Sequence, residues 1–196
     1  MYDRILRMLE ETERRVDKQC VPMGKLAWSI LEASINCRDS VKPVIRISES
    51  CAPLEQEAYI FFEYAYLFTH LAMRDAIGAL PMSLLGEVQQ YVTTLVSKVA
   101  VGMYFEHWSS ERKEAINKQF VEKLNEREAE FSEVLRTAEN ELHVLDNFIS
   151  VAAQVTNLCQ QDDNWEHMKQ PMLATMLVEW KKAGFTDHLA NIFAAH

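Results

Sequence analysis

The stretch from Glu55 to Leu80 reads EQEAYIFFEYAYLFTHLAMRDAIGAL, and it decides the fold class. Apolar and aromatic residues occupy almost every side of a helix drawn through it, and few ionisable side chains interrupt them. A helix that is apolar all round is buried inside a protein. Pro53 suits a first helical position, and Gly78 and Pro81 supply a stop, so the pattern predicts a core helix over residues 53–80.

The composition favours helices in the rest of the chain as well. Only 5 Gly and 5 Pro occur among 196 residues, whereas Leu, Ala, Glu, Met, Lys and Gln are frequent. No other part shows the period-two alternation that partner strands of a sheet would need. We therefore expect an all-α, single-domain bundle spanning residues 1–196, with about six to eight helices around the central apolar helix at 53–80.

Apolar residues at steps of three and four predict the remaining helices. They cover residues 2–18, 25–38, 84–103, a long segment from 110, a separate helix over 141–159, and two shorter helices beyond Pro171 and Thr186. We expect N-caps at Ser83, at Ser109 or Ser110, and at Thr186, and Gly184 just past a helix C-terminus. Residues 41–52 fit either a short helix or an extended connector.

The long segment after Ser110 supports two interpretations. Its apolar residues recur at steps of three, four or seven, and the opposite face is densely charged; the residues are Ile116, Phe120, Leu124, Phe131, Leu135, Ala138, Leu142 and Leu145. The segment is either an exposed helix with one packed side or a heptad seam to a second subunit. Arg127 falls at a seam position, which weakens the second interpretation.

Net charge and cysteine content limit the classes of function and the compartments that fit this protein. The formal net charge is -9, so the protein should repel nucleic acid and anionic membranes. The charged start MYDRILRMLEETERR does not resemble a secretory signal. Cysteines at 20, 37, 51 and 159 form no CxxC pair, and Glu63, Arg74 and Asp75 in the most apolar stretch argue against a membrane span. We expect a cytoplasmic protein with reduced thiols.

Four side chains on the central helix are the candidate ligand-binding residues. Glu63 and His70 are seven positions apart, which places them within about 20° of each other around the helix. Arg74 continues this stripe, and Tyr66 lies next to it. A desolvated polar stripe is costly without partners. The four side chains therefore either bond to facing helices and fix their register, or line a pocket.

In a pocket, these side chains would have distinct roles. Glu63 and His70 could bind a metal or move a proton, and Arg74 could pair with an anionic group. However, the sequence contains no Glu-x-x-His pair, and no HExxH, GxSxG, GxGxxG or P-loop motif. We therefore assign no metal ligand, leave catalytic residues and cofactors unknown, and lean against an enzyme.

Two functions remain as hypotheses. The first is an acidic cytoplasmic binding or adaptor protein that acts through helix faces on a protein partner or, as a homodimer, on a second copy. The second is a helical enzyme or a small-ligand or metal-binding protein with a pocket lined by Glu63, Tyr66, His70 and Arg74. A cavity at this stripe is what the second hypothesis requires.

Overall fold

The computed structural model describes residues 20–41, 53–137 and 165–196, with side chains omitted at 53–56, 133–137 and 165–171. Helices account for nearly all of this part, and none of it is strand. The fold class predicted from the sequence, all-α, is therefore confirmed for the described residues. They form six helices: α2 (Val21–Val41), α3 (Pro53–Ala79), α4 (Met82–Tyr104), α5 (Ser110–Thr137), α8 (Trp165–Ala183) and α9 (Phe185–Ala195).

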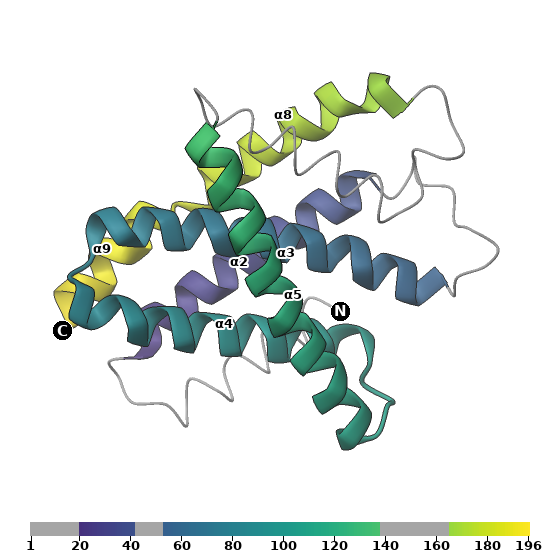
Figure 1. Cartoon of the computed structure of the whole chain (residues 1–196), viewed down its shortest axis with the longest axis horizontal. Helices are drawn as coiled ribbons and strands as arrows, with labels where there is room; N and C mark the ends of the chain where they lie inside the picture. Colours follow the sequence, from purple (N-terminus) through teal and green to yellow (C-terminus); the bar gives the residue numbers. More distant parts are fainter. Residues whose placement is uncertain (1–19, 42–52, 138–164) are drawn as a thin grey trace.

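Two helices share the middle of the arrangement. α2 packs against α3, α4, α8 and α9, whereas α3 packs against α2, α4, α5 and α9. α5 crosses steeply over α3 and α4, and the connection from α3 to α4 lies at the same end as α9 (Figure 1). The total of six to eight helices and a single centre at 53–80 stay predictions, because helices expected at 2–18 and 141–159 lie outside the described residues, as does nearly all of the 41–52 connector.

The predicted core helix has the boundaries that its prolines and glycine suggest. α3 begins at Pro53 and ends at Ala79, two residues before Pro81. Every residue from Ile60 to Met73 is buried, including the ionisable Glu63 and His70. Burial on all sides follows from the near absence of a polar face in this stretch. It also means that each charged group here must find its partner inside the protein.

α2 is longer than its pattern indicates. The predicted helix covered 25–38, but α2 runs from Val21 to Val41 and includes Asp39 and Ser40, which lie beyond the predicted end. Pro22 lies in its first turn, where a missing backbone N–H costs nothing. Near the other end, Ser40 Oγ donates to the Cys37 carbonyl at 2.6 Å, which satisfies this hydroxyl within the helix.

One of the predicted helix N-caps is confirmed and two are wrong. Ser109 caps α5, because its Oγ accepts from the Arg112 backbone N–H at 3.3 Å. Ser83 was wrong as a cap: α4 begins after Pro81 and has no side-chain cap. Thr186 was also wrong, because α9 begins at Phe185 after Gly184, whose left-handed φ of 58° ends one helix and starts the next without a linker.

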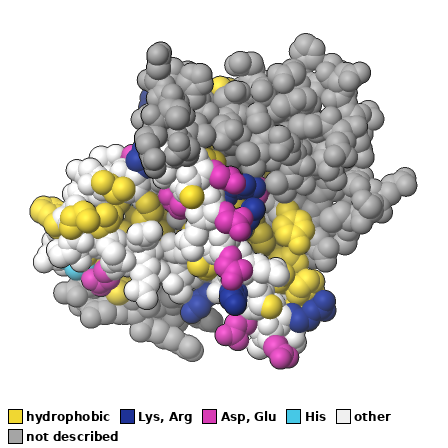
Figure 2. All heavy atoms as spheres, in the orientation of Figure 1, with side chains coloured by type: hydrophobic (Ala, Val, Ile, Leu, Met, Phe, Trp, Pro, Cys, Tyr) yellow, Lys and Arg dark blue, Asp and Glu magenta, His cyan; other side chains and the backbone are white. Residues whose placement is uncertain are grey.

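The apolar face of α5 is packed within the chain. Phe120, Leu124 and Phe131 are buried, and α5 contacts both α3 and α4. Its outer face carries charges of both signs, which Figure 2 shows along its length. For residues 110–132 the structure agrees with an exposed helix that has one packed side; self-association stays a prediction. None of the described helices has an apolar stretch long enough to cross a bilayer.

Candidate functional site

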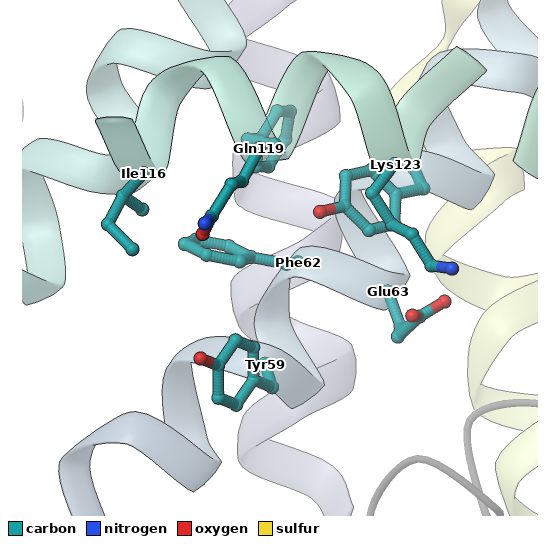
Figure 3. Close-up of a pocket in the computed structure, with 8 residues that line it drawn as sticks. Tyr59, Phe62, Glu63, Ile116, Gln119 and Lys123 are labelled. Atoms are coloured by element: carbon teal, nitrogen blue, oxygen red, sulfur yellow. The ribbon is translucent and has the colours of Figure 1, made fainter. Parts of the chain in front are cut away.

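A cleft separates part of α3 from α5. Its volume is about 260 Å³. Side chains from the two helices face one another across it, with Glu63 and Lys123 at one end (Figure 3). Eight residues line it: Tyr59, Phe62, Glu63 and Tyr66 from α3, and Ile116, Gln119, Phe120 and Lys123 from α5. The four from α3 follow steps of three and four, so they share one helix face.

Aromatic rings form most of the walls. Phe62 and Phe120 meet edge to face, with centroids 5.1 Å apart and planes at 85°. Tyr66 packs against the same Phe120 ring at 4.7 Å. Both distances lie in the range that aromatic pairs prefer, so the rings are mutually supported. Tyr59 stands at the mouth, where it remains 46% exposed.

A buried ion pair stands beside the cleft. Arg127 of α5 donates from Nε and Nη2 to the two carboxylate oxygens of Glu63, each at 2.9 Å. Both residues are about 5% exposed or less, and Arg127 Nη1 also donates to Glu130 at 2.7 Å. Burial by itself would lower the pKa of Arg127, but Glu63 and Glu130 more than offset this and raise it. Arg127 therefore stays charged.

Burial also affects the tyrosine next to this pair. It raises the pKa of the Tyr66 phenol well above its usual range, and the negative charge of Glu63 raises it further. Tyr66 thus stays neutral and keeps its proton at physiological pH. The cleft offers this group as a neutral polar contact and not as a base.

His70 lies one turn beyond Tyr66 and is joined to α5 as well. Its Nδ1 lies 2.8 Å from Glu128 Oε2, and its ring centroid lies 5.2 Å from that of Phe131. Nε2 is buried and has no hydrogen-bond partner among the residues that the structure describes. His70 does not line the cleft. Its contacts hold α3 and α5 together.

Arg74 contacts α8. Its guanidinium carbon lies 5.4 Å from the centroid of the Trp180 ring of α8, and Nη2 lies 3.8 Å from the Asp75 carboxylate. Three of the four candidate residues therefore contact α5, whereas Arg74 contacts α8. Only Glu63 and Tyr66 line the cleft. A ligand-binding role for the four residues stays a prediction.

Only two of the eight lining residues, Glu63 and Tyr66, were predicted from the sequence. Tyr59 and Phe62 of α3 and the four lining residues of α5 were not among the predicted site residues. The signal for α3 was the three- and four-residue spacing that joins Tyr59 and Phe62 to Glu63 and Tyr66. Arg127, the polar interruption of the α5 seam, is the partner that Glu63 required.

A second cavity of about 260 Å³ lies between α2 and α8. Its buried carboxylate is already paired, because Glu179 accepts from Asn36 Nδ2 at 2.7 Å and from Lys182 Nζ at 2.6 Å. Such fully paired groups typically serve packing. Within the described ranges, no three His, Cys, Asp or Glu side chains are grouped so that they could hold a metal ion.

Comparison with protein-family models, with characterised proteins and with solved structures finds no significant match.

Proposed function

We propose that this chain is a binding protein whose ligand is a small molecule held in the cleft between α3 and α5. The observation that carries the proposal is the lining itself: Tyr59, Phe62, Tyr66 and Phe120 surround a space of about 260 Å³ that contains no protein atom. Ligand sites are concave and mostly apolar, with a few polar groups that fix orientation. Here Glu63, Gln119 and Lys123 supply the polar groups.

The surroundings of the cleft favour a preformed site. The bidentate pair of Glu63 and Arg127 fixes the spacing of the two helices beside the cleft, and the contact of His70 with Glu128 does so about two turns further along α3. Preorganised walls bind more tightly because little ordering entropy is lost on binding. In this proposal Glu63 and Tyr66 contact the ligand, and His70 and Arg74 position α3 against its neighbours.

A matched pair of variants tests the proposal. Gln119→Trp places a large ring at the mouth of the cleft, whereas Asn125→Trp places the same ring on an exposed part of α5 that does not line it. Small aromatic compounds are screened for binding by saturation-transfer NMR. Compounds that bind the wild type should bind Asn125→Trp equally and lose binding to Gln119→Trp. If nothing binds, or if both variants bind alike, the proposal is wrong.

A second candidate function is that of an adaptor that acts through helix faces in the cytoplasm. Three large apolar side chains support it: Ile77 is 65% exposed, Met82 80% and Phe193 59%. They belong to the end of α3, the start of α4 and α9, which lie at the same end of the molecule (Figure 1). Exposed apolar groups of this kind are frequent at protein interfaces. Cys37 is a buried cysteine that forms no disulfide, which supports a reducing compartment.

Sedimentation velocity tests the adaptor function. The wild type should self-associate or bind a partner in pull-downs, and a triple variant with serine at Ile77, Met82 and Phe193 should lose this interaction. A compact monomer that captures no partner, or a triple variant that retains the interaction, would remove the support for this function.

A further inference from the structure

Two charged residues line the cleft, and the ion pairs that they form differ in burial. Glu63 is 4% exposed and shares both carboxylate oxygens with Arg127. Lys123 Nζ has a single ion-pair partner among the described residues, Glu126, at 2.6 Å. The side chains of Lys123 and Glu126 are 42% and 60% exposed. This difference decides which ligand charge the cleft can accept.

A cationic ligand would need the carboxylate of Glu63. Arg127 already balances the charge of that carboxylate through two hydrogen bonds, and a buried ion pair that loses one partner is strongly destabilised. Arg127 cannot lose its proton instead, because Glu63 and Glu130 raise the pKa of its guanidinium. The negative charge of Glu63 therefore stabilises the fold and does not attract a cationic ligand.

An anionic ligand needs the ammonium of Lys123, and this group is easily released. Ion pairs between exposed side chains contribute little, because water solvates both partners when they separate. Glu126 can turn to solvent, and Lys123 can turn its ammonium to a carboxylate held in the cleft. Its aliphatic stem already lies against the lining, as the stems of partly buried lysines commonly do.

The size and walls of the cleft restrict the rest of the ligand. Its volume of about 260 Å³ lies below the ~300–1,000 Å³ of sites for drug-sized molecules. Aromatic rings from both helices line it, and among them Phe62 and Phe120 support each other edge to face. Flat apolar groups pack well against such rings. The space suits one or two fused rings.

Resting on the proposed function of the cleft, we propose that its ligand is a small aromatic anion, with the ring system between α3 and α5 and its carboxylate on Lys123 Nζ. Glu126 competes with the ligand for that ammonium. The site therefore selects anionic aromatic compounds over neutral and cationic compounds of the same shape.

Three probes of matched shape test this inference: 2-naphthoate, 2-naphthylmethanol and 2-naphthylmethylammonium. Their dissociation constants are measured by titration calorimetry at pH 7 and low ionic strength. Naphthoate should bind about fivefold or more tightly than the alcohol, and the ammonium compound should bind most weakly. Lys123→Met should reduce naphthoate binding to the level of the alcohol without affecting the alcohol. Glu126→Gln should strengthen naphthoate binding.

The outcomes separate this inference from the proposed function. If all three probes bind equally and Gln119→Trp abolishes their binding, the cleft is a ligand site but its preference for anions is wrong. If the ammonium compound binds best, or if Lys123→Met leaves naphthoate binding unchanged, the inference is also overturned. If none of the probes binds, the inference and the proposed function both fail.

Discussion

Arg127 of α5 holds Glu63 of α3 by two hydrogen bonds of equal length, 2.9 Å each, to the two oxygens of one carboxylate. The residues are 64 positions apart in the sequence. This bidentate geometry restricts the relative placement of the two helices, because the guanidinium fork is rigid and planar. The pair therefore fixes the register of α5 on α3 and, with it, the shape of the adjacent cleft.

The first prediction concerns the stability that this pair provides. Arg127→Met leaves the carboxylate of Glu63 buried without a partner and should lower the free energy of unfolding by about 3–5 kcal/mol. The double variant Glu63→Leu, Arg127→Met removes both charges and should recover most of this loss. Urea unfolding followed by circular dichroism measures the stability of both variants. Lys118→Met serves as the control: Lys118 and its partner Glu122 are both exposed, so this change should have little effect on stability.

Two other results would contradict this role of the ion pair. If Arg127→Met costs no more than the Lys118→Met control, the bidentate pair does not hold α5 on α3. If the double variant is as unstable as the single one, the loss arises from packing of the arginine stem and not from the unpaired carboxylate.

The second prediction concerns two glycines with different backbones. Gly184 has a φ of 58°, which an L side chain adopts with strain, whereas Gly78 is helical and exposed. Gly184→Ala should therefore destabilise the protein by about 1 kcal/mol. Gly78→Ala should stabilise it by up to about 1 kcal/mol, since alanine favours the helix and a Cβ there meets no atom within 4 Å. Thermal unfolding of both variants should show shifts of opposite sign; shifts of the same sign contradict this prediction.

The third prediction uses two serines near helix starts. Ser109 Oγ caps α5 through the Arg112 N–H, whereas Ser83 lies in the first turn of α4 without a capping bond. Ser109→Ala should therefore cost about 1 kcal/mol of stability, and Ser83→Ala should leave it nearly unchanged. The denaturant midpoints of the two variants, compared with that of the wild type, measure these losses. Equal losses would mean that the Ser109 contact contributes no more than any serine in a first turn.

The fourth prediction concerns alkaline pH. Burial raises the pKa of the Tyr104 phenol from 10.0 to about 12, although Arg38, which donates a hydrogen bond to its hydroxyl, lowers it again in part. Because the folded state holds this proton more tightly than the unfolded state, the stabilisation is complete below pH 10 and is lost as the pH rises toward about 12.

Tyr104→Phe isolates this contribution. The variant should lose less stability than the wild type between pH 10 and about 12, as measured by urea midpoints across that interval. Phenolate absorbance should show that Tyr64 and Tyr66 also ionise late, since burial raises the pKa of both. Parallel pH profiles for the variant and the wild type would show that Tyr104 does not contribute.

The cleft shows why site prediction from the sequence was incomplete. The spacing of Glu63, Tyr66 and His70 correctly placed them on one helix face, since that follows from the helical period alone. It did not reveal that α5 covers this face, because the choice of facing helix depends on contacts distant in sequence. Arg74 shows the same limit: it continues the stripe by spacing, yet it packs on Trp180 of α8.

The amino-acid sequence by itself determined that the described part of this protein is helical, that residues 53–80 contain a helix whose middle is buried, and that the buried stripe required polar partners. These features follow from local period, composition and the cost of burying charge. Only the tertiary structure decided which partners meet the stripe. Arg127 and Glu128 lie on a helix whose own pattern fits an exposed surface equally well, and only the crossing of α5 over α3 turns them inward and leaves a cleft beside them.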